Sequence, residues 1–123
     1  MLERLIYLTE SLFRYNRLFL QYYQEARETG EKQDFEKTIK PFVNEVKDSS
    51  DEWQKLMRQW LSKVSPKHIH LKQIDTTASH IEQLSVQAFF GQTSKTRFLN
   101  SQRTVEFFLA EVLTELEKKK RDA

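Results

Sequence analysis

Several residue types that carry specialised chemistry are absent or scarce in this sequence. It has no cysteine, which excludes a disulfide framework, a thiolate metal site and a cysteine nucleophile. It has only two glycines, and neither has the glycine-rich surroundings of a phosphate-binding loop. No apolar run approaches the ~20 residues of a membrane-spanning helix or the unbroken apolar centre of a signal peptide. We therefore expect a cytoplasmic protein with no membrane association.

Charge of neither sign is in marked excess. The formal net charge is +2, and residues 1–62 carry 10 Lys and Arg against 11 Asp and Glu, whereas residues 63–123 carry 10 against 7. This asymmetry is too small to indicate a nucleic-acid-binding protein by itself. It leaves nucleic-acid binding through the basic C-terminal half as an alternative function.

The few glycines and prolines divide the chain into four amphipathic stretches. The dividing residues are Gly30, Pro41, Pro66 and Gly91. Between them, apolar residues recur three and four apart, which is typical of helices that bury one face. The predicted helices span about 2–28, 34–64, 70–90 and 95–120. Because the joints are short, we predict an all-α, single-domain, four-helix up-down-up-down bundle over residues 1–123.

Pro41 interrupts the second predicted helix near its start. Proline fits the first turn of a helix but breaks or kinks an interior, and it disfavours the α conformation of the preceding residue, here Lys40. We therefore predict a kink near 41, with a short turn at 34–39 before a long helix from about 41 to 64.

Several short segments resemble a known bacterial family. They are DFEKTIKPF at 34–42 followed by Glu45 and Trp53, PKHIHLKQI at 66–74, and Arg97-Phe98 before a final amphipathic helix. Together with the total length, these segments resemble the YppE-like family of small proteins from Gram-positive bacteria. The resemblance implies a four-helix bundle in a bacterial cytoplasm. It implies no catalytic residue, cofactor or activity.

Two polar residues lie within the apolar stripe of the first predicted helix. Thr9 and Asn16 are seven residues apart, and a buried Asn requires hydrogen-bonding partners. Asn16 could contact a ligand or could fix the register between helices, as in coiled coils, and we favour the second interpretation. Trp53 and Trp60 are also seven apart, and their apolar neighbours favour core packing over an exposed aromatic platform.

Some large apolar residues fall outside the main stripes. In the first helix Leu8, Tyr15, Leu18 and Tyr22 form an additional row, and Phe90, Leu99 and Phe107 lie off the stripe later in the chain. A contiguous exposed apolar patch would mark a partner site. We predict Leu8, Tyr15, Leu18 and Tyr22 as the possible partner surface, because tyrosine combines a large area with a polar tip.

No constellation of residues indicates catalysis or a bound metal. His68 and His70 are two apart, but His80 is the sole further histidine, and we expect His70 instead to cap the third helix with Gln73. No Glu is followed three residues later by His, as in di-iron bundles, and no serine lies in a nucleophile-elbow motif. We predict no catalytic residue, no cofactor and no metal.

Three classes of function follow from this pattern. The first is a non-enzymatic cytoplasmic protein that acts through contact with an unidentified protein or with itself. The second is nucleic-acid binding through Lys95, Arg97, Arg103 and the basic run 118–121, with those cations far apart along one helix. The third is a small-ligand or metal site near His68, His70 and Asn16. The sequence favours the first class.

Overall fold

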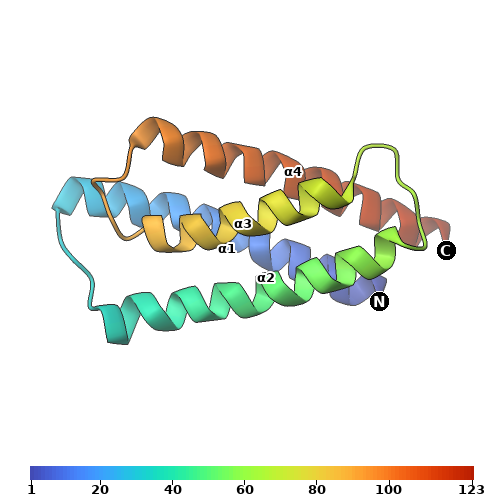
Figure 1. Ribbon diagram of the computed structural model, residues 1–123, viewed down its shortest axis with the longest axis horizontal. Helices are drawn as coiled ribbons and strands as arrows, with labels where there is room; N and C mark the ends of the chain where they lie inside the picture. Colours follow the sequence, from blue (N-terminus) through green and yellow to red (C-terminus); the bar gives the residue numbers. More distant parts are fainter.

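The protein is an antiparallel bundle of four helices. The computed structural model describes all 123 residues, with helices α1 (Leu2–Thr29), α2 (Lys40–Leu61), α3 (Leu71–Gln87) and α4 (Lys95–Asp122), and a short π-helical turn η1 (Phe35–Ile39) before α2. The chain runs up, down, up and down, so both termini lie at one end of the bundle (Figure 1). The predicted all-α four-helix fold is confirmed. No helix combines the length and the apolarity needed to cross a membrane.

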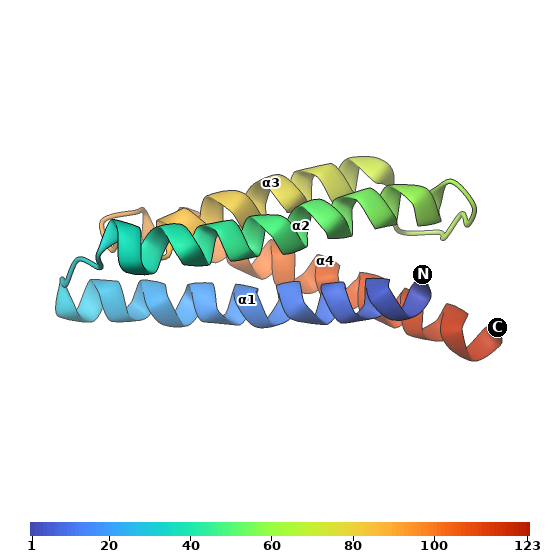
Figure 2. The ribbon, with the colours of Figure 1, turned by 90° about the horizontal axis from the view of Figure 1, so that it is seen from below.

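The core is one continuous cluster of 21 buried apolar residues drawn from all four helices and from the connection before α3. Trp53 and Trp60 both belong to it, which confirms their predicted role in packing. Each helix packs on the next, α1 packs on α4, and α1 also touches α3 across the bundle (Figure 2). Contact between α3 and α4 is the least extensive of the four neighbouring pairs.

Pro41 neither breaks nor delays the second helix. The backbone of Lys40 is α-helical at φ −59° and ψ −48°, so the expectation that Lys40 would leave the α region is wrong. Lys40 instead continues the turn η1, whose backbone N–H groups reach five residues back, and Lys40 N–H itself donates to the carbonyl of Phe35. Such a wider turn accommodates an irregularity that the α-helical pattern cannot. The predicted short turn is therefore present, but it leads directly into α2.

The two glycines serve different physical purposes, and only Gly30 directly ends a helix, since α3 ends at Gln87 before Gly91. Gly30 follows α1 with φ +67°, a left-handed conformation that glycine adopts without steric cost. Gly91 lies against the end of α1, where an added Cβ would be 2.9 Å from the carbonyl oxygen of Ala26. Gly91 therefore allows the connection before α4 to pass close to the backbone of α1.

Side chains cap the starts of α3 and α4, and the cap at α3 joins the two residues predicted for it. The backbone N–H of His70 donates to Oε1 of Gln73 at 2.7 Å at the start of α3. Oγ of Ser94 accepts from the backbone N–H of Arg97 at the start of α4. The backbone N–H groups at the start of a helix have no acceptor within that helix, and these side-chain oxygens supply one.

Two polar contacts inside the core join α1 to its neighbours. Nε1–H of Trp53 donates to Oγ1 of Thr9 at 3.0 Å, and Thr9 in turn donates to the carbonyl of Leu5. Nδ2 of Asn16 donates to the backbone carbonyl of Gln102, and Nε2 of Gln102 donates to the backbone carbonyl of Asn16. Oδ1 of Asn16 is buried without a partner. Both contacts fix one helix against another, which favours the register interpretation of Thr9 and Asn16.

Candidate binding groove between α3 and α4

The row predicted as a partner surface on α1 lies largely in the core. Leu8 is only 2% exposed, so its assignment to an exposed patch is wrong. Tyr15, Leu18 and Tyr22 are partly buried, and both tyrosine rings pack edge-on against Phe42 of α2. Burial, with a smaller contribution from Glu45, raises the pKa of Tyr15. The apolar arc of α1 is wide because α1 packs against every other helix of the bundle.

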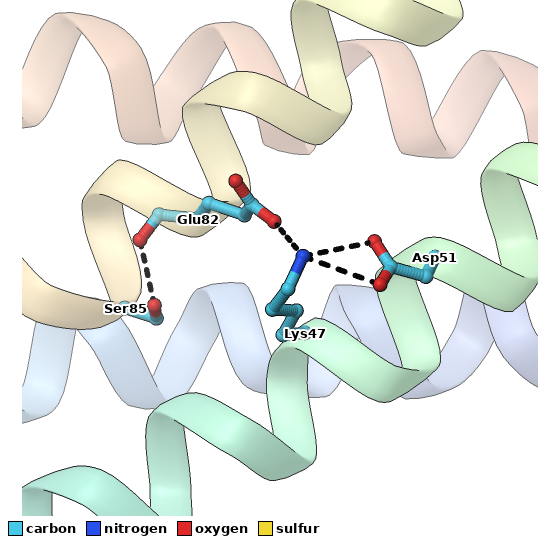
Figure 3. A network of polar contacts seen from close by, with 4 residues as sticks. All are labelled: Lys47, Asp51, Glu82 and Ser85. Atoms are coloured by element: carbon cyan, nitrogen blue, oxygen red, sulfur yellow. Dashed lines mark hydrogen bonds and ion pairs between the residues drawn. The ribbon is translucent and has the colours of Figure 1, made fainter.

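Polar side chains join three of the four neighbouring helix pairs. Arg4 of α1 binds both oxygens of Glu52 of α2 at 2.6 and 2.7 Å, and hydrogen bonding from Arg4 holds the pKa of Glu52 below its ordinary value. Between α2 and α3, Lys47 reaches Glu82 at 2.9 Å and also Asp51 on its own helix (Figure 3).

Further polar contacts strengthen the same three pairs. Arg58 joins α2 to Asp75 of α3 at 2.6 Å. Arg17 pairs with Glu106 at 3.6 Å between α1 and α4, in addition to the buried contact of Asn16. No side-chain hydrogen bond or ion pair joins α3 to α4. The line of contact between these two helices is thus held by apolar packing alone.

A groove follows this line of contact. Its upper part has a volume of about 860 Å³ and lies between the first half of α3 and the middle of α4. A second hollow of about 960 Å³ continues it toward the C-terminus, between α4 and the 62–70 connection. His70, Gln73, Phe107 and Glu111 line both hollows. We call the two together the α3–α4 groove.

One large aromatic side chain lies exposed in the α3–α4 groove. Phe107 is 69% exposed, the highest value among the large apolar side chains, whereas the adjacent Phe108 is buried. An aromatic ring in a hollow between two helices offers a large apolar area for contact. The spacing of the sequence identified Phe107 as off the main stripe, but the pattern alone did not show that it faces a groove.

The groove also gathers cations from three separate segments. They are Lys67 from the connection, Lys72 from α3, and Arg103, Lys118 and Lys119 from α4. None of them forms an ion pair within the protein. The carboxylates on the same surface belong to Glu111 and Glu115. The groove therefore has a positive balance of charge that the nearly neutral composition does not reveal.

All three histidines of the protein line this groove. His80 faces the upper part, His68 the lower part, and His70 both. They do not converge on a metal site, because no group of three or more His, Asp or Glu side chains is placed to hold an ion. Asn16 lies elsewhere, in the contact between α1 and α4. The structure thus brings His68 and His70 to one groove but separates Asn16 from them.

Comparison with known proteins places the chain among bacterial relatives. Residues 9–116 match the model of a bacterial domain of unknown function, DUF1798. The chain belongs to the DUF1798 family. The predicted resemblance is confirmed, since the chain is 25% identical over 114 residues to the uncharacterised protein YppE of Bacillus subtilis, covering 93% of each.

Solved structures of DUF1798 relatives share this fold. A Listeria innocua protein of unknown function is 27% identical, with a TM-score of 0.93 over 98% of this chain and 96% of that one. The crystal structure of B. subtilis YppE has 24% identity and a TM-score of 0.94, covering 98% of both chains. A Staphylococcus aureus DUF1798 domain has 24% identity and a TM-score of 0.84, over 93% of this chain and 96% of that one. These similarities extend to the whole bundle.

Proposed function

We propose that this DUF1798 protein is a non-enzymatic cytoplasmic binding module whose α3–α4 groove takes an acidic, amphipathic helical segment of a partner protein. The single observation that carries the proposal is the coincidence of an exposed Phe107 with five unpaired cations along the one helix pair that lacks polar cross-links. An amphipathic helix lying in a groove between two helices is a common mode of peptide recognition.

The charge pattern favours an acidic partner segment. Unpaired cations at the rim of an apolar contact speed association with a partner of opposite charge and select against basic partners. Apolar residues of the partner would contact Phe107, and its carboxylates would approach Lys72 and Arg103 on either side of the groove.

The same surface is less suited to a nucleic acid. Glu111 and Glu115 lie among the cations along α4, where a continuous phosphate backbone would meet like charge, whereas a helical segment can place its separate carboxylates beside the cations and its apolar residues elsewhere. Lys95 and Arg97 lie at the start of α4 and do not line the groove. Nucleic-acid binding is therefore retained as an outcome of the test.

Site-specific photocrosslinking in the native host tests this proposal. A photoreactive phenylalanine analogue is placed at Phe107, and a matched one at Tyr7, an exposed aromatic residue of α1 that is 53% exposed. The expected result is a crosslink at position 107, absent at position 7, to a protein segment rich in Asp and Glu with apolar residues three and four apart. Crosslinks to nucleic acid, to a basic segment, to a second copy of this chain or equally at both positions would overturn the proposal.

Charge reversal then tests the role of the cations. Arg103→Glu and Lys72→Glu should each reduce the position-107 crosslink severalfold, because each places a negative charge against an acidic partner. Lys55→Glu on α2 is the matched control, since Lys55 is exposed and lies outside the groove. An unchanged crosslink in the groove variants would refute the acidic character of the partner.

A further inference from the structure

A separate hollow lies at the opposite end of the bundle from the chain termini. It has a volume of about 450 Å³ and is bounded by the last turns of α1, the connection after it, η1, the start of α2 and Phe89. The last turns of α1 and the start of α2 lie at the end of the bundle away from both termini (Figure 1). Pockets for small ligands commonly measure ~300–1,000 Å³. We call it the α1-end hollow, and it shares no residue with the α3–α4 groove.

Three aromatic rings line the α1-end hollow. Tyr22 and Phe89 are stacked with centroids 5.5 Å apart, and Phe42 meets both rings edge-on at 5.4 and 5.6 Å. These rings come from α1, the segment after α3, and α2, so the fold brings together three segments distant in sequence. The face of an aromatic ring is electronegative and attracts a cation, most strongly where water is excluded.

The charged groups of the same hollow favour a cation. Glu25 and Glu31 line it, and the one cationic side chain among its lining residues is Lys37. None of these three residues forms an ion pair. The carbonyl end of α1, where the helix dipole is negative, also lies here, but so do η1 and the start of α2, where the dipole is positive, and the two helix ends offset each other. An anionic ligand would meet two carboxylates against a single lysine.

We propose that the α1-end hollow binds a small organic cation, a compact amine or quaternary ammonium group with an apolar body. The cationic group lies near Glu25 and Glu31, and the apolar body lies against Tyr22 and Phe42. The aromatic rings and the carboxylates are independent features, and together they suit a ligand that combines a cationic group with an apolar part. The proposal does not depend on the function proposed for the α3–α4 groove.

Paired probes of equal shape test the proposal directly. Isothermal titration calorimetry compares choline with 3,3-dimethyl-1-butanol, which replaces the quaternary nitrogen by carbon and carries no charge. We expect saturable binding of choline that is about tenfold tighter than binding of the neutral alcohol. Equal binding of the two probes would overturn the assignment to cations. Absence of saturable binding by choline, tetramethylammonium and putrescine up to ~10 mM would overturn the site itself.

Variants locate the probe within the protein. The double variant Glu25→Gln with Glu31→Gln should weaken choline binding by about tenfold with little change in fold, because both side chains are exposed. Glu28→Gln is the matched control, since Glu28 is exposed on α1 and does not line the hollow. Tyr22→Leu should weaken binding as well, and the double variant keeps the test decisive if Tyr22→Leu is unstable. Equal effects of Glu28→Gln and the double variant would contradict the location.

Discussion

Replacing Asn16 by leucine is expected to stabilise this protein, although it removes a buried hydrogen bond. Nδ2 of Asn16 donates to the carbonyl of Gln102 at 2.9 Å, but Oδ1 of Asn16 is buried with no partner. The reciprocal bond from Gln102 ends on the backbone carbonyl of Asn16, so any residue at position 16 retains it. Leucine has the same number of side-chain heavy atoms as asparagine and the same branching at Cγ, is somewhat bulkier, and introduces no polar atom.

The expected magnitude follows from two opposing terms. The lost hydrogen bond costs about 1 kcal/mol net, since the carbonyl of Gln102 lies inside α4 and can keep its helical bond. Removing a buried acceptor that has no partner raises the free energy of unfolding by about 1–3 kcal/mol. The balance favours the variant Asn16→Leu by about 1 kcal/mol, which corresponds to a rise in Tm of about 3–5 °C for a domain of this size.

Urea and thermal unfolding, followed by circular dichroism, measure this difference. Asn16→Ala is the comparison variant, because it removes the same polar atoms but leaves a cavity, and it should be about 2–3 kcal/mol less stable than Asn16→Leu. A loss of more than ~1 kcal/mol in Asn16→Leu would refute the reasoning. That result would mean that Oδ1 of Asn16 has a partner, such as a buried water or a ligand, and that Asn16 does more than fix register.

Three further outcomes test other parts of the fold. Thr9→Val should cost about 1–3 kcal/mol in urea unfolding, because it leaves the buried Nε1–H of Trp53 without its acceptor. Gly91→Ala should cost about 1–3 kcal/mol in the same assay, because its Cβ meets the α1 backbone at 2.9 Å; an unchanged midpoint would contradict that close approach. Arg4 lowers the pKa of Glu52, so this pair stabilises the fold at pH values above the pKa of Glu52 in the unfolded chain. The stabilisation is lost as the pH falls through the pKa of Glu52 in the folded protein. Glu52→Gln should therefore make Tm depend less on pH in this acidic range.

The architecture could be predicted because local and global signals agree. Apolar residues three and four apart indicated the helices, and the glycines and prolines indicated the joints between them, although α2 and α3 end at Leu61 and Gln87, about three residues before the predicted ends. The π-helical turn before Pro41 could not be predicted in the same way. Proline disfavours an α conformation at the preceding residue in general, yet Lys40 is α-helical here and continues a turn whose hydrogen bonds reach five residues back, a pattern that the sequence does not display.

The candidate sites could not be predicted from the sequence, because they depend on which helices are neighbours in the fold. Leu8 and Phe107 both lie off the main apolar stripe of their helices, yet one is 2% and the other 69% exposed. The difference arises because α1 packs against three helices, whereas α4 meets α3 along the least extensive contact of the four neighbouring pairs. Periodicity gives the width of an apolar arc but not the number of helices that cover it.

The structure places unlike charges on two different surfaces, a separation that the overall composition does not show. The net charge of +2 describes neither the positive α3–α4 groove nor the α1-end hollow with its two carboxylates. The two surfaces carry opposite balances of charge, and the ligands proposed for them accordingly differ in charge. Each carboxylate or cation involved is free of internal ion pairs, while Arg4, Lys47 and Arg58 are all committed to bridges between helices. The bundle thus uses one set of charges to hold its helices together and leaves a second set available for ligands.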